Sequence, residues 1–98
     1  MAYAPIVILH VPLSDERELD AFVEQCLIDG VKFVAVFGDG ASRIEDTINE
    51  IVEGDGSDED RFILTSSHDP ATETLDDVLA LCAEVGRQDG CSIQRVTL

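Results

Sequence analysis

The sequence is short of positive charge. It holds 6 Lys and Arg residues against 21 Asp and Glu residues, Lys32 is its only lysine, and the net charge is −15 at pH 7. Proteins bind nucleic acid by neutralising phosphates with Lys and Arg, so this composition argues against DNA, RNA or an anionic membrane surface as a ligand. The acids occur in every segment, which is typical of a solubilising surface, or of a proteome adapted to salt or biased by base composition towards Asp and Arg. The same charge also fits a surface that docks on a basic partner.

The chain also lacks a cysteine pattern that would indicate disulfides or a metal. Cys26, Cys82 and Cys91 are odd in number and widely spaced, with no C-x-x-C pair and no Cys/His cluster. Cys26 and Cys82 fall among apolar residues at helical spacing, so we expect both thiols to be buried and unreactive.

A long apolar run is absent too. The opening "MAYAPIVILHVPLSDE" has no basic residues before its short apolar stretch, no small-residue cleavage site after it, and too few apolar residues to span a bilayer. A chain of 98 residues with 45% apolar content is enough for one core. The sequence therefore predicts a single cytoplasmic domain over residues 1–98, without a transmembrane segment.

Short apolar runs rich in Val, Ile and Phe recur along the chain. Three of them, bounded by Pro, Gly or Asp, predict strands buried on both faces: Pro5 to Val11, Val31 to Gly38 and Arg61 to Ser67. The tail "CSIQRVTL" alternates enough to predict a fourth, half-exposed strand at a sheet edge.

Helical patterns lie between these runs. The first begins in the acidic "SDERE" and ends at Gly30, which is expected to act as a C-cap. The second begins at Ser42, where "SRIE" is a capping-box pattern, and stops at Gly54 before the polar loop "DGSDED". In the third, Asp69 followed by Pro70 is expected to be the N-cap and first helical residue.

Strands separated by helices of this length are joined by right-handed crossovers and lie parallel. We therefore expect an α/β fold: a small three-layer α/β/α sandwich with three helices and a four-stranded, mainly parallel sheet. The expected strand order is 2-1-3-4, which is flavodoxin-like, and the direction of the last strand is left open. In such sheets ligands bind beyond the carboxyl ends of the strands, where the chain reverses its winding.

Three loops would meet at that edge: "HVPLSD", "FGDGAS" and "SSHD". Gly38-x-Gly40 suggests a phosphate-binding turn, but Arg43 replaces the third glycine of a dinucleotide fingerprint, and Asp39 puts negative charge where a phosphate would sit. Two glycines in a tight turn explain the motif without a ligand, and no cofactor is predicted.

Acids near the same edge raise the question of a metal. Asp15, Asp39 and Asp69 could converge there, and oxygen ligands at strand ends hold Mg²⁺ in receiver domains. The receiver pattern of paired acids, phospho-accepting Asp and downstream lysine is missing, however, and Asp15 and Asp69 are suited to capping helices. No metal site is predicted.

The strand end "TSSHD" holds the residue types of a hydrolase triad. Sequence neighbours seldom adopt triad geometry, and no G-x-S-x-G elbow is present, so no catalytic residue is predicted. His10 would approach His68 if their strands were adjacent, and the two rings could then bind a transition metal or act as a pH-sensitive pair. Capping and packing are the simpler explanation. The candidate ligand-binding residues are His68, Ser66, Ser67, Asp39 and His10.

The stretch "TSSHD" followed by "ETLDDVLALC" resembles a pattern in small bacterial α/β domains of uncharacterised function, in which a T-S-x-H strand end precedes an E-[TS]-L-x-x-[VA] helix. The resemblance covers about twenty residues of the 98 and implies the same small fold. It implies no activity.

Two functions follow as hypotheses. The first is a non-enzymatic protein-binding module, similar to immunity proteins or inhibitors, that docks on a basic partner. The alternative is a small ligand-binding or metal-binding domain, or an enzyme, that uses the carboxyl edge around His68, Ser66, Ser67 and Asp39. Homodimer formation through the last strand is a further expectation, since Arg95 is the main deterrent to pairing along that edge.

Overall fold

Strands and helices alternate along the chain. A computed structural model describes residues 3–12, 17–54, 63–86 and 92–98. Their order is β1 (Ile6–Val11), α1 (Glu18–Asp29), β2 (Phe33–Gly38), α2 (Ala41–Glu53), β3 (Leu64–His68), α3 (Leu75–Gly86) and β4 (Ile93–Thr97). The predictions for Asp15, residues 55–60, Arg61 and Cys91 fall outside the described residues. No described helix is long and apolar enough to cross a membrane.

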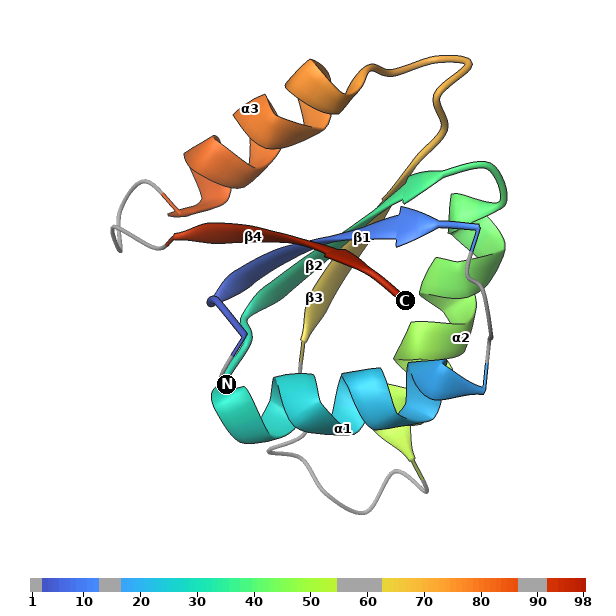
Figure 1. The fold of residues 1–98 in the computed structure, drawn as a ribbon, viewed down its shortest axis with the longest axis vertical. Coiled ribbons are helices and arrows are strands. Elements are labelled where there is room, and N and C mark those ends of the chain that lie inside the picture. The colour runs from blue at the N-terminus through green and yellow to red at the C-terminus, as the bar shows by residue number, and fades with distance from the viewer. Residues whose placement is uncertain (1–2, 13–16, 55–62, 87–91) are drawn as a thin grey trace.

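The sheet has four parallel strands in the order β3-β2-β1-β4 (Figure 1). The α/β class and the parallel sheet are confirmed, and the direction of the last strand is now known. The predicted order 2-1-3-4 is wrong, because β3 pairs with β2 and not with β1. Burial explains the arrangement: β1 and β2 are apolar and nearly closed to solvent, whereas β3 and β4 are more polar and form the two edges.

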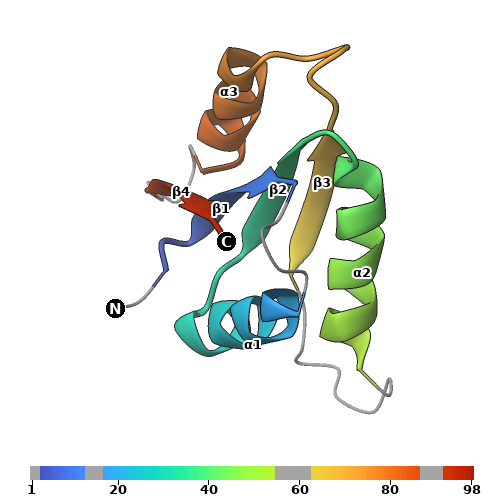
Figure 2. The ribbon, with the colours of Figure 1, turned by 45° about the vertical axis from the view of Figure 1, so that its right-hand side comes forward.

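Successive crossovers place the helices on two faces (Figure 2). The chain steps from β1 to β2 to β3 in one direction, so right-handed connections put α1 and α2 on the same side of the sheet. The step from β3 back past β2 and β1 to β4 runs the other way and puts α3 on the opposite side. The result is the expected three-layer α/β/α arrangement.

Each face of the central strands has its own core. Alternate residues of β1 and β2 pack with α1 and α2; the buried members of this larger cluster include Val7, Leu9, Phe22, Ile44 and Ile48. The other face packs against α3 in a smaller cluster made of Ile6, Ile8, Phe33, Ala35, Val78 and Cys82. The period of two along a strand therefore produces both cores from continuous apolar runs.

Helix ends agree with the sequence at two glycines. Gly30 adopts the left-handed conformation with φ 76°, and its backbone N–H caps α1 by donating to the carbonyls of Cys26 and Leu27. α2 ends at Glu53 with Gly54 as its C-cap, whose N–H donates to the Glu50 carbonyl. The helix stops read from Gly30 and Gly54 are confirmed.

The last strand lies at a sheet edge, as expected. β4 pairs with β1 alone, and its exposed residues alternate with half-buried ones. A parallel edge strand of this kind offers unpaired backbone groups to another chain. Homodimer formation through β4 stays a prediction.

Candidate functional site

A pocket of about 230 Å³ lies where β2 and β3 end side by side. It is built from the start of α2 on one side and the β3–α3 loop on the other. Its lining residues are Gly40, Ala41, Ser42, Ser67, His68, Asp69, Thr72 and Glu73. Of the five candidate residues from the sequence, the pocket takes in two, His68 and Ser67. Ser66 is not among the lining residues but contacts His68, which is. Asp39 and His10 are not among them either.

The α2 side of the pocket depends on two glycines. At Gly38 a Cβ would lie 2.0 Å from the Val11 carbonyl oxygen, so only glycine lets the end of β2 approach β1 this closely. Gly40 has φ 81° and is the N-cap of α2. Steric need and chain reversal therefore account for the Gly38-x-Gly40 motif without a ligand. Asp39, between them, is exposed.

The capping box predicted at Ser42 is wrong. The N-cap of α2 is Gly40, two residues before Ser42, so the helix begins at Ala41, and no side chain caps its first turn. Glu45 points instead to β3, where its Oε2 accepts a hydrogen bond of 2.8 Å from the Thr65 hydroxyl. The Thr65 oxygen is also 2.9 Å from Asn49 Oδ1. These polar contacts join α2 to the edge strand on the face opposite His68.

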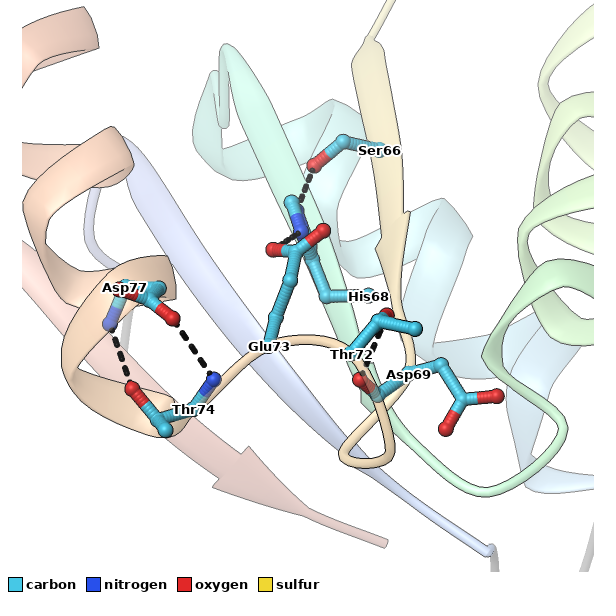
Figure 3. A network of polar contacts seen from close by, with 7 residues as sticks. All are labelled: Ser66, His68, Asp69, Thr72, Glu73, Thr74 and Asp77. Atoms are coloured by element: carbon cyan, nitrogen blue, oxygen red, sulfur yellow. Dashed lines mark hydrogen bonds and ion pairs between the residues drawn. The ribbon is translucent and has the colours of Figure 1, made fainter.

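His68 is the one buried polar side chain of the described residues, with 7% of its surface exposed. Its Nε2 lies 2.7 Å from Ser66 Oγ, and its Nδ1 lies 2.5 Å from Glu73 Oε2 (Figure 3). Ser66 and His68 share a face because residues two apart on a strand point the same way. The network therefore ties the β3–α3 loop to the sheet by both nitrogens of one ring.

The loop after His68 folds as a turn, not as the start of a helix. Asp69 Oδ1 accepts from the Ala71 N–H, and the Asp69 carbonyl accepts from the N–H groups of Thr72 and Glu73. The prediction that Asp69 and Pro70 begin the third helix is wrong, because Asp69 uses its side chain for a local Asx turn. This turn is what brings Glu73 back to His68.

α3 begins five residues later with a capping arrangement of its own. The Thr74 hydroxyl accepts from the Asp77 N–H at 3.2 Å, and Asp77 Oδ2 accepts from the Thr74 N–H at 2.9 Å. These reciprocal bonds are a capping box in which Asp stands in the usual Glu position. Figure 3 shows them next to the His68 network.

His10 lies elsewhere, and its predicted approach to His68 is wrong. β2 separates the two strands: Phe37 pairs with His10 on one side and with His68 on the other. The Arg95 Nε donates a 3.0 Å hydrogen bond to His10 Nε2, and the His10 and Phe37 rings meet edge to face at 6.2 Å. Burial, followed by the positive charge of Arg95, lowers the pKa of His10.

The described residues hold no cluster suited to a metal ion: no three of their His, Cys, Asp or Glu side chains come together as a metal site. Cys26 and Cys82 are fully buried, as predicted. Burial, with a smaller contribution from Asp29, raises the pKa of the Cys26 thiol to about 12, and burial also raises the pKa of Cys82. Both thiols are therefore poor nucleophiles at neutral pH.

Glu73 is the functional candidate that the sequence reasoning missed. A third helix that began at Pro70 would include Glu73 in its first turn, whereas Glu73 lies in the turn that precedes α3. The pattern Asp-Pro-Ala-Thr, in which an Asp can bond its own backbone two residues on, was the available sign of a turn.

The fold and site define the class of this chain: a small α/β fold with a polar pocket at the carboxyl edge of a parallel sheet. The chain belongs to a family described as a domain of unknown function, DUF7684, whose model matches residues 2–98. No curated protein and no solved structure matches the chain.

Proposed function

We propose that the chain is a protein-binding module whose acidic surface docks on a basic partner. The observation that carries this proposal is a ridge of acids on α2, formed by Asp46, Glu50 and Glu53, which we call the α2 ridge. Its residues are spaced i, i+4 and i+7 and are all exposed. They lie opposite the buried stripe of the helix, which contains Ile44 and Ile48.

Folding does not require acids at these positions. Glu50 and Glu53 occupy the end of α2, where the helix dipole disfavours negative charge by a few tenths of a kcal/mol to about 1 kcal/mol each. No basic residue occupies the last turn of any described helix to offset it. Acids that occupy these positions despite the electrostatic cost fit a role in recognition. Charge complementarity would raise the association rate and make binding sensitive to salt.

The test compares two regions with the same number of acids. The full chain is used to capture proteins at low and at high ionic strength, and a retained basic protein is then titrated against two triple variants. One is Asp46→Asn, Glu50→Gln, Glu53→Gln on the α2 ridge. The control is Glu18→Gln, Asp20→Asn, Glu24→Gln on α1, where the first-turn acids Glu18 and Asp20 are suited to the helix dipole.

The ridge variant is expected to bind about tenfold more weakly or worse, chiefly through slower association, while the α1 variant changes little. The proposal fails if no basic protein is retained at low ionic strength. It also fails if both triple variants weaken binding equally, because that result describes non-specific charge attraction.

A second candidate is the binding of a small polar ligand in the carboxyl-edge pocket. The observation in its favour is that six of the eight lining residues carry polar side chains, with Ser42, Ser67 and Thr72 in the same lining as His68. Asp69 and Glu73 in the same lining disfavour an anion, so a neutral or cationic ligand fits best.

NMR titration of the full chain with small polyols, amines and carboxylic acids tests this second function. Chemical-shift changes confined to the lining residues, and reduced by Ser67→Ala and by Thr72→Val, are the expected result for a polyol or an amine. Shifts spread evenly over the surface, or none at all, would remove the pocket from consideration.

A further inference from the structure

Ser66, His68 and Glu73 meet in the atomic order of a serine nucleophile, a histidine base and an orienting acid. Ser66 Oγ is 2.7 Å from His68 Nε2, and the opposite ring nitrogen, Nδ1, is 2.5 Å from Glu73 Oε2 (Figure 3). Activated serines are recognised by this geometry and not by sequence position. We propose that Ser66 is a nucleophile activated by His68, with small activated esters as its substrate class. The proposal goes beyond the docking function and does not depend on it.

The partners of the ring determine where the protons lie. An ionised Glu73 carboxylate only accepts hydrogen bonds, so His68 Nδ1 carries the proton in that contact. In the neutral ring Nε2 is then the acceptor, and the Ser66 hydroxyl donates to it. This is the tautomer that a general base needs, since the free lone pair of Nε2 faces the nucleophile.

Burial is distributed as this role requires. His68 is almost fully buried, whereas Ser66 is only partly buried and the Glu73 side chain is 39% exposed. A buried base that two partners hold in one rotamer needs little reorganisation during the reaction. The nucleophile keeps a route to solvent.

The open face of β3 provides that route. α3 packs on β1 and β2 through Val78 and Cys82, and β3 lies at the far edge of the sheet (Figure 2). Leu64, two residues before Ser66 and on the same face, is 50% exposed. A substrate can therefore reach Ser66 from the α3 side of the sheet, and Leu64 offers an apolar contact for a small acyl group.

The reaction is an acyl transfer in two steps. Ser66 Oγ forms a bond to the acyl carbon, its proton moves to His68 Nε2, and the alcohol leaves with that proton as the ester bond breaks. Water then attacks the acyl carbon and gives one proton to His68 Nε2; the bond between the acyl carbon and Ser66 Oγ breaks, His68 returns the proton to Ser66 Oγ, and the carboxylic acid is released. The relay supplies a nucleophile and a base but no oxyanion stabilisation, which restricts the substrates to esters with good leaving groups.

The experiment treats the full chain with an alkyl fluorophosphonate and maps the adduct by intact mass and peptide sequencing. Ser66 Oγ bonds to phosphorus, fluoride leaves and His68 takes the proton. Labelling is expected at Ser66 alone, and Ser66→Ala is expected to abolish it. Ser92→Ala is the matched control: this exposed serine lies just before β4 at the opposite edge of the sheet, so its loss should leave the rate unchanged. Absence of an adduct, or equal labelling of Ser66 and Ser67, overturns the proposal.

The role of the base is tested by His68→Ala. Loss of a general base typically slows such a reaction about 10²-fold or more, and added imidazole is expected to restore part of the rate. A purely structural role for His68 would not respond to imidazole. Should this variant fail to fold by circular dichroism, His68→Gln is used in its place, and labelling of a folded variant at the wild-type rate would overturn the proposal.

Glu73 is a positioning residue, and its test relies on a conservative pair. Glu73→Asp keeps the carboxylate and is expected to keep part of the labelling rate, whereas Glu73→Gln keeps the size but loses about tenfold or more. Equal rates in the two variants would show that the charge of Glu73 has no part in activating Ser66 and would overturn the relay.

Discussion

His10 and His68 lie on strands that do not touch, with Phe37 of β2 between them. The two histidines therefore cannot act as a pair, and each has a different set of partners. His10 accepts a hydrogen bond from Arg95 at the β1–β4 side of the sheet, while His68 joins Ser66 to Glu73 at the β3 edge. The candidate site at the ends of β2 and β3 therefore contains one histidine, His68. The other, His10, links β1 to β4.

His10→Gln should flatten the fall in stability on mild acidification. The pKa of His10 is lowered from its usual 6.5 by burial and by Arg95, so the unfolded chain binds a proton more readily than the folded one. The contribution of neutral His10 is complete above that usual value and is lost as the pH falls towards the lower folded pKa.

The measurement for His10 is the free energy of unfolding in urea at several pH values from about 7 to about 5. The wild-type chain should lose stability relative to His10→Gln over that range. Parallel curves for the two proteins would contradict the assignment, because other titrating groups affect both equally.

Thr74→Ala should destabilise the chain by about 1 kcal/mol. The Thr74 hydroxyl accepts the Asp77 N–H at the start of α3, and without it that donor loses its partner in the helix cap. Ser42→Ala is the control, since no side chain caps α2 and Ser42 is an exposed residue inside the helix. The measurement is the free energy of unfolding of both variants in urea. An equal or larger loss of stability in Ser42→Ala would support the capping box at Ser42 that the sequence suggested.

The strands were predictable because their apolar composition indicates burial. β1 and β2 are continuous apolar runs and occupy the centre of the sheet, as such runs must. The order of the strands was not predictable by the same reasoning. A right-handed crossover from β2 can place β3 beside β2 or, in the other direction, beside β1, depending on which face of the sheet carries the helix. The polar residues of β3, Thr65 to Ser67, were the overlooked sign of an edge strand.

The candidate site was predicted in part for a similar reason. His68 and Ser67 reach the pocket because parallel strand ends meet at one edge, which topology alone implies. Glu73 was missed because its position depends on the turn formed by Asp69, and helix periodicity says nothing about such a turn. Asp39 stays a prediction: it is exposed between two glycines and is not among the residues that line the pocket.

The two described cysteines should not react with thiol reagents in the folded chain. Cys26 and Cys82 are fully buried, and the Cys26 thiol has a pKa of about 12. In a Cys91→Ser background, which removes the third thiol, a disulfide reagent at neutral pH is expected to react only after denaturant is added, and then with two equivalents. Rapid reaction of the native variant would show that one of these helix positions opens to solvent.

Gly38→Ala should be the most damaging small substitution at the carboxyl edge. A Cβ at Gly38 would meet the Val11 carbonyl oxygen at 2.0 Å, and φ there is 140°, a conformation that other residues rarely adopt. Because the atom it meets is backbone of the neighbouring central strand, relief requires β1 and β2 to separate. We expect a loss of about 3 kcal/mol or more in the free energy of unfolding.

Gly40→Ala separates the steric clash from backbone strain alone. Gly40 has φ 81°, but a Cβ there meets nothing within 4 Å, so the expected loss is about 1 kcal/mol. Urea denaturation of the two variants measures the difference. If Gly38→Ala is no less stable than Gly40→Ala, the close approach of β2 to Val11 does not hold in solution, and the pocket wall that begins at Gly40 is placed differently from the arrangement described above.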